Sequence, residues 1–104
     1  RSATTDELTG LGNRRAAMNR LRELRASSER SQAALACMLM DVDHFKRVND
    51  TFGHEAGDLV LRETANLLRR AARIDEPVFR LGGEEFLVLC SHSSAHNAAT
   101  GAER

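Results

Sequence analysis

An apolar run at residues 34–42 ends abruptly in the carboxylates Asp41 and Asp43. The run is short for a helix, and its sudden polar end favours a strand that is buried along its length. Such a strand delivers acid side chains to its own C-terminal end. The chain is therefore expected to contain a sheet with negative charge at one strand end.

An amphipathic helix is predicted before this strand. Asn13 is a suitable N-cap, and Ala17, Leu21 and Leu24 recur at spacings of four and three, which places them on one helical face. The helix should run to about residue 26. Residues 27–32 are polar and rich in serine, which indicates a surface connection to the strand.

Two further helices are predicted after the strand. A short one begins near His44 and ends at Gly53, a residue well suited to a helix C-terminus. A longer one is capped by Asp58 and ends near Arg73. Its inward stripe is expected to consist of Val60, Thr64, Leu67 and Ala71.

A β-hairpin with an acidic tip is predicted next. Pro77 excludes further helix, and two short β-type runs, residues 78–81 and 86–90, flank the sequence GGEE at residues 82–85. Residues 91–104 are small and polar and show no clear apolar face. The sheet is therefore expected to gain two strands from this hairpin.

Composition excludes several classes of protein. The 104 residues, of which 41% are hydrophobic, suit one small globular domain. The 15 basic and 15 acidic residues cancel, so no DNA or RNA partner is expected. No apolar run approaches the roughly 18 residues of a membrane span, so this domain should make no membrane contact. Cys37 and Cys90 lie in apolar stretches, which favours two reduced, buried thiols in a cytoplasmic protein without a disulfide.

The acid side chains fall into two groups, one at the end of the predicted strand and one at the hairpin tip. If the hairpin packs beside the strand, Asp41 and Asp43 approach Glu84 and Glu85, and gathered anions need a hard cation such as Mg²⁺. Because Mg²⁺ commonly takes one or two carboxylates together with water and substrate phosphates, the arrangement predicts a nucleoside triphosphate site.

Neighbouring residues also suit a phosphate ligand. Gly82 and Gly83 have no Cβ, so the hairpin tip can bend sharply and a ligand can approach its backbone. The helix that begins near His44 would point free N–H groups at phosphates, and Lys46 could add a positive charge.

Simpler interpretations compete with this one. A Gly-Gly turn followed by two glutamates is common in surface hairpins. A calcium-binding loop is excluded, because Phe45 and Lys46 stand where that motif needs an oxygen ligand and a glycine. Zinc is not assigned, because Cys90, His92 and His96 lack a fourth ligand at a familiar spacing.

Three ordered motifs together resemble the GGDEF family of diguanylate cyclases: DELTGLGNRR at residues 6–15, DVDHFKRVNDTFGHEAGD at 41–58 and RLGGEEF at 80–86. The signature reads GGEEF, which keeps a carboxylate at Glu84. The resemblance implies an α+β fold, an antiparallel-rich central sheet flanked by helices, similar to the adenylyl cyclase catalytic domain and the polymerase palm. It also implies condensation of two GTP into cyclic di-GMP and pyrophosphate with Mg²⁺, or with Mn²⁺ as an alternative ion.

The resemblance assigns the metal ions to Asp41, Glu84 and the carbonyl oxygen of Val42. Glu85 resembles the acid next to the ribose 3′-hydroxyl, as a further metal ligand or as the general base, so Glu84 and Glu85 are the catalytic candidates. By similarity, two domains face each other as a homodimer, and each 3′-oxygen attacks the α-phosphorus of the partner's GTP.

The guanine base would be bound by Asn49 and Asp58. An Asp acceptor suits guanine N1–H and the exocyclic amine, a donor pattern that adenine lacks. The other nucleotide-binding positions implied by the resemblance are Leu8, His44, Phe45, Lys46, Gly82 and Gly83. The first two resemble the wall of the guanine pocket, the next two face the phosphates, and the glycines leave room for the nucleotide.

Two departures from the family pattern concern regulation and extent. Members that are inhibited by their product carry Arg-x-x-Asp before the signature, and here the corresponding pair is Arg73 and Glu76. Family domains also continue with further strands and a helix. Residues 1–104 are therefore expected to form a GGDEF domain that lacks its C-terminal part and exposes a sheet edge.

Two rival functions remain open beside the enzyme. A catalytically inactive domain could serve as a receptor for GTP or cyclic di-GMP, and a purely structural dimerisation module would tolerate Asp41→Ala without a change in nucleotide behaviour. Intact Glu84 and Glu85 favour the enzyme. The resemblance implies bacterial signal transduction in the cytoplasm, within a parent protein that could be attached to a membrane.

Overall fold

The computed structural model describes residues 3–31 and 34–90. Its elements, in chain order, are α1 (Arg14–Ser31), β1 (Ala36–Asp41), α2 (Phe45–Phe52), α3 (His54–Ala71), β2 (Val78–Gly82) and β3 (Glu85–Cys90). The strands form one antiparallel sheet in the order β1-β3-β2, so the hairpin strand β3 lies in the middle. The predicted α+β class and the predicted hairpin are confirmed.

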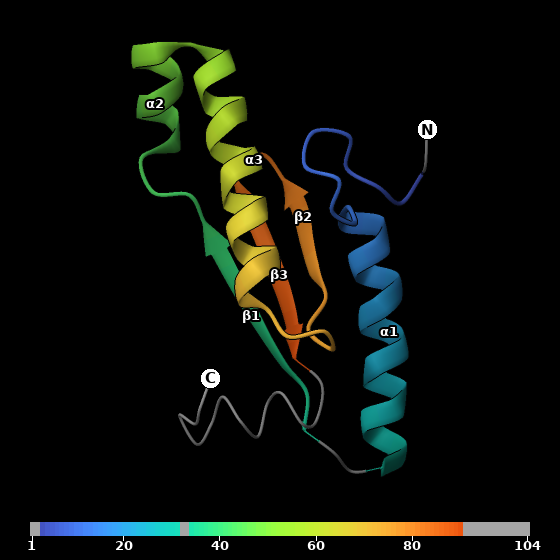
Figure 1. Cartoon of the computed structure of the whole chain (residues 1–104). Coiled ribbons are helices and arrows are strands. Elements are labelled where there is room, and N and C mark those ends of the chain that lie inside the picture. The colour runs from blue at the N-terminus through green and yellow to red at the C-terminus, as the bar shows by residue number, and fades with distance from the viewer. Residues whose placement is uncertain (1–2, 32–33, 91–104) are drawn as a thin grey trace.

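The two long helices cover opposite faces of β3 (Figure 1). On one face, the wholly buried Phe86 packs against Leu61 and Ala65 of α3. On the other face, Leu87 and Leu89 belong to a cluster with Ala17 of α1 and Phe79 of β2, which Leu21 and Leu24 extend. Because neighbouring strand residues alternate between faces, one strand anchors both layers.

Helix α1 begins as predicted and ends later. Asn13 caps its N-terminus, since its Oδ1 accepts the N–H of Ala16 at 3.1 Å. The helix continues to Ser31, so the surface connection predicted at residues 27–32 is wrong over most of its length. Serines do not end a helix by themselves, and Arg25 and Glu29 form a supporting pair at 3.5 Å.

Gly53 separates α2 from α3 by a single residue. Its N–H donates to the carbonyl oxygen of Asn49 at 2.8 Å, and its φ of 93° lies in a region that favours glycine. The end of the short helix at Gly53 is thus confirmed. Helix α3 starts directly afterwards, at His54, so the prediction that Asp58 caps it is wrong.

The buried stripe of α3 also differs from the prediction. Gly57, Leu61 and Ala65 are buried, because they face the sheet and α2, whereas the predicted member Leu67 is 58% exposed. The stripe predicted at Val60, Thr64, Leu67 and Ala71 is therefore wrong. Apolar residues occupy both sides of this helix, so spacing alone did not identify the inward side.

Strand β1 is an edge strand within the described part of the chain. There it pairs with β3 alone, and Met38 and Leu39 are 52% and 70% exposed. The prediction of a strand buried along its length is therefore wrong. Cys37 is exposed as well, contrary to expectation, whereas Cys90 is buried.

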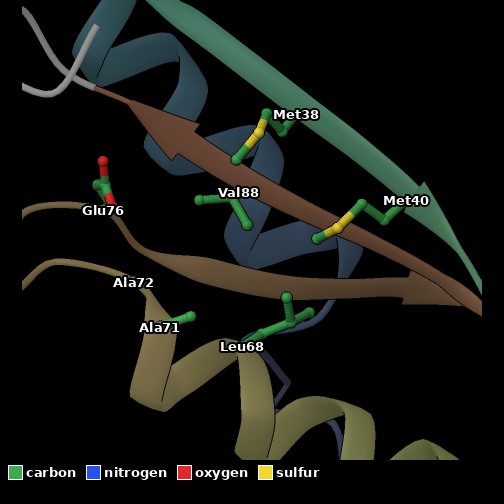
Figure 2. Close-up of a pocket in the computed structure, with 7 residues that line it drawn as sticks. All are labelled: Met38, Met40, Leu68, Ala71, Ala72, Glu76 and Val88. Atoms are coloured by element: carbon green, nitrogen blue, oxygen red, sulfur yellow. The ribbon is translucent and has the colours of Figure 1, made fainter. Parts of the chain in front are cut away.

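An apolar cavity of about 250 Å³ lies between β1 and the end of α3 (Figure 2). Its lining consists of Met38, Met40, Leu68, Ala71, Ala72, Glu76 and Val88. Glu76 is the one charged side chain in this lining. Among the described residues, no helix has the length and apolar character that crossing a bilayer requires.

Candidate functional site

The ends of β1 and β3 bring three of the four predicted acid side chains together, whereas Asp43 lies beyond the ladder and does not line the same hollow. Asp41 and Glu85 are direct cross-strand partners, and the N–H of Val42 donates to the carbonyl oxygen of Glu84 at 3.2 Å. That hydrogen bond holds the hairpin tip against the chain that leaves β1. The predicted approach of the tip to the end of this strand is confirmed.

An open hollow of about 380 Å³ lies over these strand ends, lined by Asp41, Gly82, Gly83, Glu84 and Glu85. Within residues 3–31 and 34–90, none of its three carboxylates forms an ion pair with a basic side chain. Like charges directly opposite each other across an antiparallel pair are destabilising. The hollow therefore concentrates negative charge that the described protein groups do not offset.

The donor set fits a metal ion that arrives with a nucleotide. In the described ranges, no three Asp, Glu, His or Cys side chains gather closely enough to hold an ion by themselves. Mg²⁺ does not need such a cage, since it usually keeps several waters and takes one or two carboxylates together with phosphate oxygens. Asp41 and the two glutamates at the hairpin tip can supply those carboxylates.

Arg80 joins the hairpin tip to the N-terminal loop. Its Nε and Nη2 donate to the carbonyl oxygen of Gly83 at 3.0 and 2.7 Å, while its Nη1 donates to both carboxylate oxygens of Asp6 at 3.0 and 3.2 Å. The side chains of Arg80 and Asp6 are only 15% and 19% exposed. Gly83 adopts φ of 45°, a conformation that the tight turn requires and glycine tolerates. One guanidinium thus fixes the tip backbone.

Sequence reasoning assigned no role to Arg80 or Asp6. The signal in the sequence was that Asp6 lies in the first motif and Arg80 in the third. No local pattern indicates a contact between residues 74 positions apart. Thr9 completes the network, since its N–H and Oγ1 donate to Asp6 Oδ2 at 2.9 and 2.7 Å.

The Asp6 carboxyl should make stability depend on pH. Burial raises its pKa, but the hydrogen bonds from Thr9, followed by the hydrogen bond and charge of Arg80, together hold the pKa below its usual range. A lowered folded-state pKa gives stability that is fully present above the unfolded pKa of about 4 and is lost as pH falls through the folded value. Thermal melts from pH 7 to pH 3 should therefore show a smaller loss of stability on acidification for Asp6→Asn than for the wild type.

The exposed carboxylate Glu63 on α3 provides the control for this experiment. Glu63→Gln should retain the wild-type pH dependence, because it removes a carboxylate outside the Asp6 network. An acid-induced loss of stability that is the same in Asp6→Asn and in the wild type would contradict this assignment.

The two predicted guanine-binding residues lie on the α2–α3 helix pair, at the same end of the sheet as the acid tip (Figure 1). Asp58 is exposed in the second turn of α3. Asn49 is partly buried on α2, and its Oδ1 is buried without a hydrogen-bond partner among the described residues. The two residues are thus carried by packed helices and not by a loop.

The remaining predicted nucleotide-binding residues differ in environment. Leu8 and Phe45 pack against the core cluster around Phe86, so the core fixes their positions. His44 is exposed and has φ of 59°, the one positive φ of a non-glycine residue in the described chain. Lys46 is exposed and forms an ion pair with Asp50 at 2.9 Å, so its charge is shared with a neighbouring carboxylate.

Glu76 points into the protein. It is 5% exposed, its Oε1 accepts the N–H of Arg73 at 2.8 Å, and its carboxylate is seen at the apolar cavity in Figure 2. The two residues of the expected product-inhibition site are therefore joined through the Arg73 backbone in a closed turn. The side chain of Glu76 stabilises this turn.

The antiparallel sheet and its helical layers give the chain the fold shared by adenylyl cyclase catalytic domains and polymerase palms. The family described as "Diguanylate cyclase, GGDEF domain" matches residues 3–104, and the chain belongs to this family. It is similar to diguanylate cyclase DgcS of Shewanella oneidensis, with 39% identity over 84% of this chain and 29% of the relative. Similarity to diguanylate cyclase DgcP of Pseudomonas aeruginosa reaches 48% identity over 88% of this chain and 14% of that protein.

Solved structures give the same result. The GGDEF domain of DgcB from Caulobacter crescentus, crystallised in complex with c-di-GMP, superposes with a TM-score of 0.89 at 40% identity. The match covers 96% of this chain and 58% of that one. The chain thus spans less than two thirds of the length of each of these three relatives.

Proposed function

We propose that this domain is a diguanylate cyclase, which condenses two GTP into cyclic di-GMP and releases two pyrophosphates. The observation that carries the proposal is the direct pairing of Asp41 with Glu85 beside the GGEEF tip, over an open hollow without a basic partner in the described chain. A protein maintains such repulsion where a ligand offsets it. The names of the relatives support cyclic di-GMP synthesis as the reaction.

Asp41, Glu84 and the carbonyl oxygen of Val42 would hold Mg²⁺, or Mn²⁺ in its place. The ion, when bound, supplies positive charge to the phosphate oxygens and makes the 3′-hydroxyl more acidic. Glu85 would lie beside that hydroxyl and accept its proton. The 3′-oxygen then forms a bond to the α-phosphorus of the second GTP, and the bond from that phosphorus to pyrophosphate breaks.

Guanine would be bound at the α2–α3 pair, with Asp58 as the acceptor for the N1–H and the amine and Asn49 as a second partner. Leu8 and His44 would line the base, the backbone at Phe45 and Lys46 would face the phosphates, and the glycines of the tip would leave them room. The positive φ of His44 supports a role here, because strained residues cluster at ligand sites.

Two domains would act together, since the hollow of each domain would hold one GTP and the reaction joins two GTP molecules. A homodimer in the bacterial cytoplasm is the proposed setting, with an upstream signal controlling how the domains meet. Product inhibition at Arg73 and Glu76 would require the Glu76 carboxylate to leave its buried position.

A receptor for GTP or cyclic di-GMP is the second candidate. It is favoured by the lining of the hollow, which contains acids and glycines and includes no basic side chain in the described part of the chain. A receptor domain would bind the nucleotide through a metal ion and through contacts with the guanine base, and it would form no product.

Incubation of the purified protein with GTP and Mg²⁺, with products identified by mass spectrometry, separates the two candidates. The wild type should form cyclic di-GMP and pyrophosphate in a ratio of one to two, Glu84→Ala should form none, and the exposed-site control Glu63→Ala should match the wild type. Bound GTP without product would overturn the enzyme and favour the receptor, and the absence of both binding and product would contradict both candidates.

A further inference from the structure

Gly57 is a glycine inside a regular helix, where its backbone does not require one. It lies in the first half of α3, is buried, and has no positive φ. Glycine is less favourable than alanine in such a position because it loses more backbone freedom on folding. The absence of a side chain therefore needs a steric reason.

That reason is the side chain of Asn49. A Cβ built on Gly57 would overlap the Asn49 Oδ1, and it would lie 2.9 Å from the Asn49 Cγ and 3.3 Å from the Cζ of Phe45. All of these atoms belong to α2. The bare Cα of Gly57 thus leaves the space that the Asn49 amide occupies.

The amide gains no hydrogen bond from this position. Its Oδ1 is buried without a partner in the described part of the chain. A buried acceptor without a partner is unfavourable, and in native proteins such groups are found where a functional constraint holds them. The oxygen and nitrogen of an amide diverge from Cγ, and only the oxygen of Asn49 is a buried atom without a partner among the described residues, so the nitrogen is the atom that is left for a ligand.

We propose that Gly57 is a positioning residue for guanine recognition, which acts by admitting the Asn49 oxygen against α3 and turning Nδ2 toward the bound base. This inference rests on the proposed function. Asp58 follows Gly57 directly, so the same stretch of α3 that orients the Asn49 donor also carries the acceptor. A donor beside a carboxylate matches guanine, in which the acceptors O6 and N3 lie on either side of the N1–H and the amine, whereas adenine has no N1–H.

Gly57→Ala should push the Asn49 side chain out of this position and weaken guanine binding selectively. Affinities are measured by titration calorimetry with Mg²⁺ and 3′-deoxy-GTP, which lacks the attacking hydroxyl, and with 3′-deoxy-ATP in parallel. We expect the Kd for the guanine nucleotide to rise about tenfold, the loss of one hydrogen bond to the base, and the Kd for the adenine nucleotide to change less than about twofold. A role in helix packing alone would change both values together.

The double variant Asn49→Ala/Gly57→Ala tests whether Gly57 acts through Asn49. It should bind 3′-deoxy-GTP as Asn49→Ala does, within about twofold, because the added methyl then meets no amide. If Gly57→Ala alone does not fold, the double variant should fold and keep that affinity. A double variant that fails to fold, or that binds much more weakly than Asn49→Ala, overturns the inference.

Gly53→Ala is the matched control in the same helix connection. A Cβ at Gly53 meets nothing within 4 Å, but the φ of 93° strains any other residue, so this variant should melt earlier and keep the wild-type preference for guanine. If Gly57→Ala retains the wild-type preference for guanine, this inference is overturned and the proposed function is not. A wild type without any preference for guanine overturns the proposed function and, with it, this inference.

Discussion

Asp41→Asn is expected to lower the rate of cyclic di-GMP synthesis by about 1000-fold or more and to raise the melting temperature of the metal-free protein by about 1 to 5 °C. The two effects have one cause. Asp41 opposes Glu85 in the β1–β3 ladder, so the folded protein contains two like charges side by side without a basic partner in the described chain. Removal of one charge relieves the repulsion and removes a proposed ligand of the metal.

Asp43→Asn is the matched control, because Asp43 lies two residues further on, outside the ladder, and faces His44 at 3.5 Å. Its activity should remain within about threefold of the wild type, since removing one exposed side-chain contact changes little. Melting curves with and without Mg²⁺ and GTP complete the test, because these ligands should stabilise the wild type more than Asp41→Asn. An active Asp41→Asn, or one that melts earlier than the wild type, would contradict this account of the strand ends.

Arg80→Met is expected to reduce the rate by about 100-fold and the melting temperature by about 10 °C. Methionine keeps much of the apolar stem but makes none of the hydrogen bonds from Arg80 to Asp6 and Gly83. The Asp6 carboxylate then remains largely buried without its cation, and the Gly83 carbonyl loses its two donors. Movement of the tip displaces Glu84 and Glu85 from the geometry that turnover needs.

Arg62→Met provides the control on the exposed side of α3, where no partner of Arg62 is found among the described residues. It should match the wild type in rate and melting temperature. The double variant Asp6→Asn/Arg80→Met should be more stable than Arg80→Met, because it no longer contains the unpaired carboxylate. Wild-type turnover by Arg80→Met would show that the network does not position the tip.

The acid site was predictable because its parts are local and their relation follows from strand pairing. Asp41 ends an apolar run, Glu84 and Glu85 follow a glycine pair, and an antiparallel hairpin beside that run places them together. The Arg80–Asp6 pair was not predictable in the same way. Nothing in the neighbourhood of either residue identifies a partner 74 positions away.

Two errors, in the buried stripe of α3 and in the burial of β1, have a physical origin in tertiary packing. Apolar residues occur on two sides of α3, and contact with Phe86 selected Leu61 over Leu67. The run that forms β1 contains enough apolar residues for an interior strand, yet Leu39 is 70% exposed, because the core cluster on its face is formed, within the described chain, by α1, β2 and β3 and includes no residue of β1. The hydrophobic pattern indicates which residues tend to be buried, but contacts with neighbouring elements determine which residues are buried.

The central claim is that the acids at the strand ends hold a divalent ion together with GTP, and Mn²⁺ binding followed by electron paramagnetic resonance tests it most directly. Titrations are made with and without 3′-deoxy-GTP, so turnover does not interfere. The account predicts that the nucleotide tightens Mn²⁺ binding by about tenfold or more in the wild type and has little effect in Asp41→Asn and Glu84→Gln. Equal nucleotide-dependent Mn²⁺ binding by all three proteins would contradict it.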